Sequence, residues 1–181
     1  SNNAKIVPII EPVKNQVNGL NSALETMIKN GMRFALILNP KDGDFKRDAD
    51  NDMLPKLKVL QDDREHWIPA YFYKKNADVL LAYAEAHNLA QLMVVFPEGV
   101  NIHDKELMKF LANERVKYVV NGNSSNSAVT KLRVLGKDVI SLEDHFNLQN
   151  KNADYASNDD EFFSDDFLYY KDSGFYGFAD Y

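Results

Sequence analysis

The chain has 181 residues, 45% of them hydrophobic and 27% charged, and its formal net charge is −6, a composition typical of a globular protein that can form one core. The absence of cysteine excludes disulfides, thiolate metal sites and cysteine nucleophiles, and the acidic charge argues against a nucleic-acid-binding groove. No apolar run approaches the roughly 18 residues of a membrane helix and no signal peptide is visible, so we expect a cytoplasmic protein without membrane contact.

Residues 5–11 form the first predicted strand, an apolar and mostly β-branched run that ends at Glu11. Because the run hardly alternates between apolar and polar residues, it indicates a strand covered on both faces. Pro8 has no backbone N–H, so we expect a bulge or an unpaired position there. The next segment predicts an amphipathic helix that ends before Gly31, because its apolar residues recur at helical spacing. These residues are Leu20, Ala23, Leu24, Met27 and Ile28.

The same alternation of strand and helix continues along the chain. Five further strands are predicted at residues 34–38, 67–73, 92–96, 116–120 and 139–142. The helices between them include one that begins after Asp52, with Pro55 in its first turn and with Leu57 and Leu60 facing the core. Strand–helix repeats of roughly 20 to 30 residues predict βαβ units with right-handed crossovers and a parallel sheet.

Two α/β architectures agree with these repeats, a doubly wound open sheet and a (β/α)8 barrel. No glycine-rich fingerprint follows the first strand, which disfavours the dinucleotide-binding form of the open sheet. The even spacing, with a polar residue at nearly every strand end, favours the barrel. We expect one domain, with repeating βα units over residues 1–145. Residues 146–181 are acidic and aromatic, and we expect them to fold over the barrel mouth.

Four segments carry a resemblance to a known family. They are Lys5-Ile-Val-Pro-Ile-Ile-Glu-Pro-Val-Lys14, Phe34-Ala-Leu-Ile-Leu-Asn-Pro40, Val139-Ile-Ser-Leu-Glu-Asp144 and Gly177-Phe-Ala-Asp-Tyr181. The chain resembles an uncharacterised bacterial family related to the phage "beta protein" family, whose members look like (β/α)-barrels. Members are longer at both ends, so the resemblance implies that the six strands are the second to seventh of eight. It therefore implies an incomplete (β/α)8 (TIM-like) barrel, and it carries no established activity.

Polar residues stand at or just beyond the predicted strand ends. They are Glu11, Asn39, Lys74, Glu98, Asn121, Asp144 and Asp180. In barrels this edge holds the sites, because the loops there converge on one mouth. Glu11 is the leading candidate, since a partly desolvated carboxylate can act as a general base or hold a divalent cation. The alternative is a structural carboxylate that accepts backbone N–H groups from the next loop.

Two further sets of residues follow from these strand ends. Glu11, Glu98 and Asp144 together would bind Mg²⁺, which prefers oxygen ligands, unless they are separate surface acids. His145 beside Asp144 is a candidate acid or base, so the catalytic candidates are Glu11, Asp144 and His145. The small polar loop 121–127 is either an anion cradle or a turn with a helix N-cap. The substrate-binding candidates are Asn39, Lys74, Asn121, Asn123 and Asp180.

The sequence leaves two functions open. The first is a metal-assisted hydrolase or lyase that acts on a phosphorylated or nucleotide-like substrate, with Glu11 central. The second is a non-catalytic protein-interaction module of a bacterial or phage-related system. In that module the aromatic C-terminal segment, residues 162–181, would bind a protein partner or drive self-association. Fold alone does not decide between an enzyme and a binding module.

Overall fold

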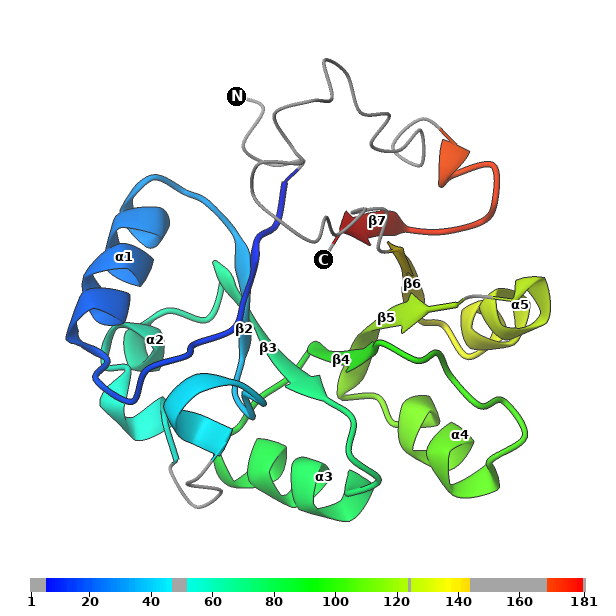
Figure 1. The fold of residues 1–181 in the computed structure, drawn as a ribbon, viewed down its shortest axis with the longest axis horizontal. Coiled ribbons are helices and arrows are strands. Elements are labelled where there is room, and N and C mark those ends of the chain that lie inside the picture. Colours follow the sequence, from blue (N-terminus) through cyan, green and yellow to red (C-terminus); the bar gives the residue numbers. More distant parts are fainter. Residues whose placement is uncertain (1–5, 47–51, 124, 144–168, 181) are drawn as a thin grey trace, which may run out of the picture. The chain divides into compact units, whose positions relative to one another are not determined.

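The computed structural model describes residues 6–46, 52–123, 125–143 and 169–180 (Figure 1). Its contacts form two units, Ser1–Val95 with Ala112–Tyr118, and Phe96–Leu111 with Val119–Tyr181. Among these described residues the sheet has seven strands, hydrogen-bonded in chain order from β1 to β7. A doubly wound sheet reverses its strand order, whereas consecutive parallel strands are the topology of a (β/α)8 barrel. The predicted class, a parallel α/β sheet with the topology of an incomplete barrel, is confirmed.

The first unit alternates strands and helices from β1 to β4. Its elements are β1 (Ile9–Ile10), α1 (Asn18–Lys29), β2 (Phe34–Ile37), η2 (Gly43–Lys46), η3 (Leu54–Lys56), α2 (Val59–Asp62), β3 (Trp67–Phe72), α3 (Ala77–Ala86) and most of β4 (Leu92–Phe96). Each strand pairs with the next in parallel. In Figure 1 the helices α1, α2 and α3 lie on one side of these strands.

Both faces of the central strands in the first unit are covered. Every residue of β2, β3 and β4 is buried, as expected from their unbroken apolar runs. Tyr71 of β3 packs edge-on against Tyr83 of α3, with ring centroids 6.3 Å apart, so Tyr71 faces the helices. Pro8 precedes the paired residues of β1, and its carbonyl accepts a hydrogen bond from Ala35 N at 2.8 Å. Pro8 therefore lies just before the paired residues, where its carbonyl still bonds to β2 and its missing N–H leaves no pair between the described residues of β1 and β2 incomplete.

The helix predicted after Asp52 is broken into two short pieces, η3 and α2. Leu57 separates them, because its backbone (φ −94°, ψ 72°) leaves the helical region. Leu57 and Leu60 are fully buried, as predicted. The Asp52 carboxylate accepts hydrogen bonds from Leu54 N at 3.2 Å and from the Tyr83 hydroxyl at 2.5 Å. Burial and this hydrogen bond raise the pKa of Tyr83, so its phenol stays protonated and fastens α3 to this segment.

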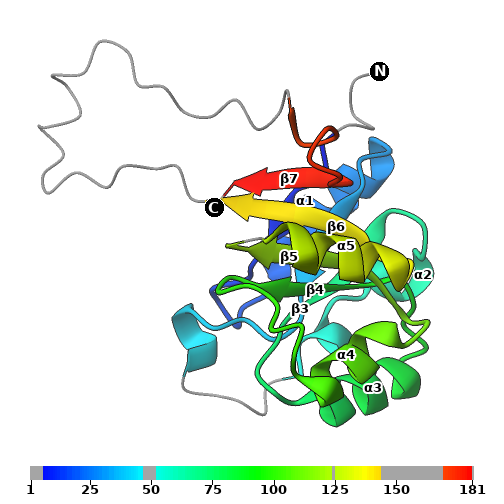
Figure 2. The same ribbon diagram turned by 90° about the vertical axis from the view of Figure 1, so that its right-hand side faces the viewer.

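The second unit contains most of α4 (Lys105–Ala112), the end of β5 (Val116–Gly122), α5 (Asn126–Val134), β6 (Asp138–Glu143) and β7 (Gly177–Asp180). Strands β6 and β7 are parallel, and Figure 2 shows their arrows side by side. β7 was not among the six strands predicted from the sequence. In the part of the chain that the structure describes, no helix has the length and hydrophobicity needed to cross a lipid bilayer.

Candidate functional site at the strand ends

In the first unit, three predicted site residues follow three neighbouring strands. Glu11 follows β1, Asn39 lies just beyond β2, and Lys74 lies just beyond β3. Because these strands are parallel, their carboxyl ends share one edge. The three residues therefore come to one edge of this unit, as the sequence predicts, and their hydrogen bonds decide what each is able to do.

Glu11 joins the end of β1 to the loop after β2. Its Oε1 accepts a hydrogen bond from Lys41 N at 2.7 Å, and the side chain is half-buried. This is the backbone contact that a structural carboxylate would make. The contact uses one oxygen. The carboxylate is thus held in one orientation, and none of the described residues hydrogen-bonds to its second oxygen, Oε2.

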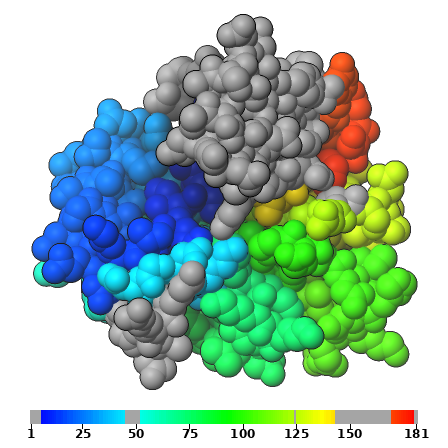
Figure 3. All heavy atoms as spheres, viewed as in Figure 1, coloured from blue at the N-terminus to red at the C-terminus, as the bar shows by residue number. Residues whose placement is uncertain are grey.

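The loop that carries Lys41 is fastened to the segment after β1. Asp44 N donates to Val13 O at 2.9 Å, and Asn15 N donates to the Asp44 carboxylate at 3.1 Å. Gly43 has a φ of +68°, and a Cβ there would lie 1.9 Å from Val13 O. Figure 3 shows the cyan atoms of this loop against the blue atoms of the N-terminal segment. The position of Lys41 is therefore fixed by several contacts.

Lys41 adds a positive charge to this edge. Its Nζ lies 4.5 Å from the centroid of the Phe72 ring, which is a cation–π contact. Lys41 was not among the predicted site residues, because it lies beyond the strand end in a polar loop whose composition is that of a solvated loop. By contrast, the predicted Lys74 is exposed, and its backbone N–H donates to Asn76 Oδ1 at 3.3 Å. The charged residues of this edge whose positions are fixed by observed contacts are thus Glu11, through its hydrogen bond from Lys41 N, and Lys41, through Phe72.

Asn39 extends the pairing between β2 and β3. Its Nδ2 donates to Phe72 O at 2.8 Å, and its Oδ1 accepts from Phe72 N at 2.8 Å. The amide side chain thus replaces a backbone strand partner at the place where β2 ends. Both polar ends of Asn39, which the sequence predicts to bind substrate, already have a backbone partner.

In the second unit, the side chain of Asn121 also hydrogen-bonds to backbone at a strand end. It is fully buried at the end of β5, and its Oδ1 accepts a hydrogen bond from Val100 N at 2.7 Å. Asn123, the next predicted substrate residue, is exposed and has a φ of 47°. Ser125 caps α5 by accepting from Ala128 N at 3.3 Å. This cap agrees with the turn and N-cap interpretation of the loop.

The remaining predicted site residues are Asp144, His145, Asp180 and Glu98. Asp144 and His145 lie outside the described residues, so their predicted roles stay predictions. Asp180 ends β7, opposite Glu143 of β6. Glu98 is exposed in the second unit, whereas Glu11 belongs to the first. Within the described residues, no three His, Asp or Glu side chains are grouped to hold a metal ion.

Comparison of the chain with protein-family models, curated proteins and solved structures gave no match. The resemblance to the bacterial family related to the phage "beta protein" family therefore stays a prediction.

Proposed function

We propose that this protein is an α/β-barrel enzyme, a hydrolase or lyase that acts on a phosphorylated or nucleotide-like substrate at the carboxyl ends of β1 to β3. The observation that supports this proposal is the Glu11 carboxylate, which Lys41 N–H orients at 2.7 Å. A carboxylate that is held in one orientation can accept a proton, and the same edge carries the positive charge of Lys41, which can attract an anion.

Each group has a distinct role in this proposal. Glu11 Oε2 acts as the general base. If an Mg²⁺ ion binds at this edge, Glu11 Oε2 would be one of its oxygen ligands and not the base. The Lys41 ammonium group attracts the substrate phosphate. Phe72 limits the freedom of Lys41 by holding its Nζ over the ring. Catalysis by an oriented base is typically worth about 100-fold or more in rate.

The Glu11→Gln variant tests this role. A glutamine Oε1 still accepts the hydrogen bond from Lys41 N, so the melting temperature should change little. The charge and the basic oxygen are lost, so hydrolysis of p-nitrophenyl phosphate or bis(p-nitrophenyl) phosphate, with and without Mg²⁺, should fall about 100-fold. Glu114→Gln, at an exposed acid away from this edge, is the matched control. A Glu11→Gln variant that loses stability but keeps its activity would show that Glu11 is structural.

A second function is favoured by the aromatic residues near and in β7. Tyr169, Tyr176 and Phe178 have exposed fractions of 55%, 59% and 40%. Large exposed rings are typical of surfaces that bind another protein. In this second function the chain is a binding module whose C-terminal segment self-associates or contacts a partner.

The surface variant Tyr176→Ser/Phe178→Ser tests the binding module. It keeps the backbone pairing of β7 with β6, whereas deletion of the segment would remove a strand. If the module is correct, the native protein associates in sedimentation velocity and the variant does not, while Glu11→Gln associates normally. Val79→Ser, at another exposed apolar residue, is the control. A native protein that stays monomeric at high concentration would rule out self-association through these rings.

A further inference from the structure

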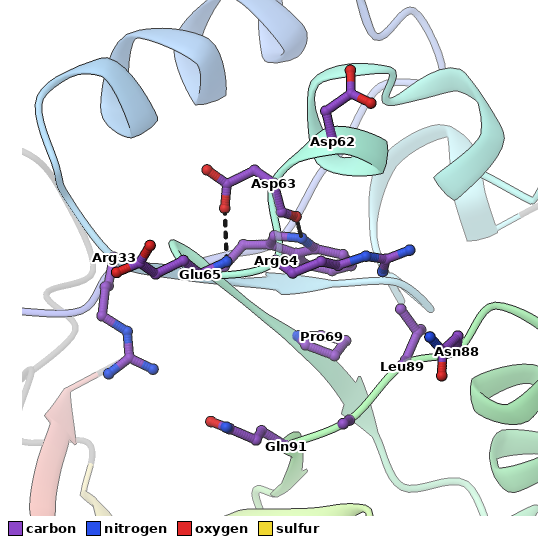
Figure 4. A pocket seen from close by; sticks show the side chains of 11 residues that line it. Arg33, Asp62, Asp63, Arg64, Glu65, Pro69, Asn88, Leu89 and Gln91 are labelled. Atoms are coloured by element: carbon purple, nitrogen blue, oxygen red, sulfur yellow. Dashed lines mark hydrogen bonds between the residues drawn. The ribbon is translucent and has the colours of Figure 1, made fainter.

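A pocket of about 880 Å³ lies at the amino-terminal ends of β2, β3 and β4, within the first unit. Its position is opposite to the strand ends that carry Glu11. Figure 4 shows its walls, which come from the residue before β2, the turn before β3 and the loop between α3 and β4. A volume of this size is in the range of small-molecule sites. The pocket therefore has room for an organic ligand.

Two of the three acidic residues that line the pocket, Asp63 and Asp62, do not compete for its arginines. Asp63 accepts hydrogen bonds from Glu65 N at 2.9 Å, His66 N at 2.8 Å and His66 Nδ1 at 2.8 Å. Burial opposes ionisation of Asp63, but these hydrogen bonds outweigh it and hold its pKa below the ordinary 3.8. In Figure 4 the carboxylate of Asp62 points away from Pro69. Glu65 is the remaining acid of the pocket lining.

The pocket lining contains two arginines, Arg33 and Arg64. Within the described residues, Arg33 and Arg64 have no ion pair and no side-chain hydrogen bond. Figure 4 shows their guanidinium groups on opposite sides of Pro69. A guanidinium group donates two parallel hydrogen bonds to a carboxylate or a phosphate. The pocket thus offers two separate anion-binding groups, and its lining also includes the apolar side chains of Pro69 and Leu89.

The backbone departs from its usual preferences twice in this pocket. Pro69 lies inside β3, between two paired strands, where proline removes a hydrogen-bond donor from the ladder. Gln91 has a φ of 55° just before β4. Asn88, at φ 51°, follows the end of α3, where a left-handed asparagine is common. Gln91 has no such local reason, and departures of this kind gather at functional sites.

We propose that this pocket binds an organic anion with two acidic groups, a dicarboxylate whose ends pair with Arg33 and Arg64. Its apolar body lies over Pro69 and Leu89, and the amides of Asn88 and Gln91 add hydrogen-bond donors. This site uses none of the residues of the proposed catalytic edge, so each proposal stands or fails on its own.

The only tryptophan of the chain provides a direct probe, because Trp67 lines this pocket. Its indole N–H donates to Asp63 O at 2.8 Å, so an amide NMR spectrum contains one indole signal, at the site. Titration with adipate should shift this signal saturably. Arg33→Gln and Arg64→Gln should each weaken adipate binding about tenfold or more, because each removes a charged hydrogen-bond pair.

Arg133→Gln, at an exposed arginine of α5, is the matched control and should bind adipate like the native protein. Hexanoate, with one acid group, should bind at least about tenfold more weakly than adipate. An unshifted indole signal, equal binding of hexanoate, or native affinity in the Arg33→Gln/Arg64→Gln double variant would overturn the proposal. The ligand-free indole signal of each variant reports whether the pocket remains folded.

Discussion

Gly122→Ala should destabilise the protein by about 2–4 kcal/mol, because the added methyl group has no space. A Cβ at Gly122 would lie 1.9 Å from Pro97 O and 2.8 Å from Pro97 C, both backbone atoms. The turn that carries Pro97 cannot simply move away, because the buried Asn121 side chain accepts a hydrogen bond from Val100 N just after it. Equilibrium unfolding in urea measures the loss.

Gly19→Ala is the matched control for this prediction. Gly19 lies in α1, and a Cβ there meets nothing within 4 Å. Alanine is the better helix former, so this variant should gain about 0.5–1 kcal/mol. If Gly122→Ala were instead as stable as the native protein, that result would contradict the close contact between the end of β5 and the turn after β4.

The strands with unbroken apolar runs could be predicted from the sequence, and β7 could not. Residues 34–38 and 92–96 are apolar throughout. A strand with apolar side chains on both faces removes all of them from water only if both faces are buried. β7 is Gly-Phe-Ala-Asp, in which glycine and aspartate are both unfavourable in strands. It pairs with β6 through backbone hydrogen bonds, which do not depend on side-chain pattern. The break at Leu57 is likewise a backbone feature, and the buried leucines around it still fit a helix pattern.

The sequence also predicted where polar side chains gather, but not what they touch. Parallel strands place Glu11 and Asn39 at one edge whatever their partners are. Whether the Asn39 amide binds a ligand or the backbone of Phe72 depends on the exact position of the next strand, which the sequence does not specify. Lys41 has no signal beyond its place in a polar loop. The pocket with Arg33 and Arg64 was missed because its residues are far apart in the chain and lie at the opposite strand ends.

Asn39→Ala should destabilise the protein by about 2–3 kcal/mol, because it removes both hydrogen bonds to Phe72 and leaves a backbone N–H and C=O without those partners. Asn39→Asp should lose about as much, since a carboxylate accepts from Phe72 N but cannot donate to Phe72 O. Urea unfolding with circular dichroism measures both variants. The control is Asn101→Ala, whose exposed side chain accepts one hydrogen bond from His103 N at 3.0 Å and should cost less than about 1 kcal/mol.

This prediction separates the two roles open to Asn39. A structural asparagine lowers the unfolding free energy when it is replaced, and affects activity only through the fraction of folded protein. A substrate-binding asparagine would leave stability within about 0.5 kcal/mol of native and raise KM for a phosphate ester. The half-buried amide with two backbone partners at 2.8 Å favours the first result. The Phe72 ring also contacts Lys41 Nζ, so loss of Asn39 should make the position of Lys41 less fixed as well. The substitution should therefore lower both the stability of this edge and its affinity for an anion.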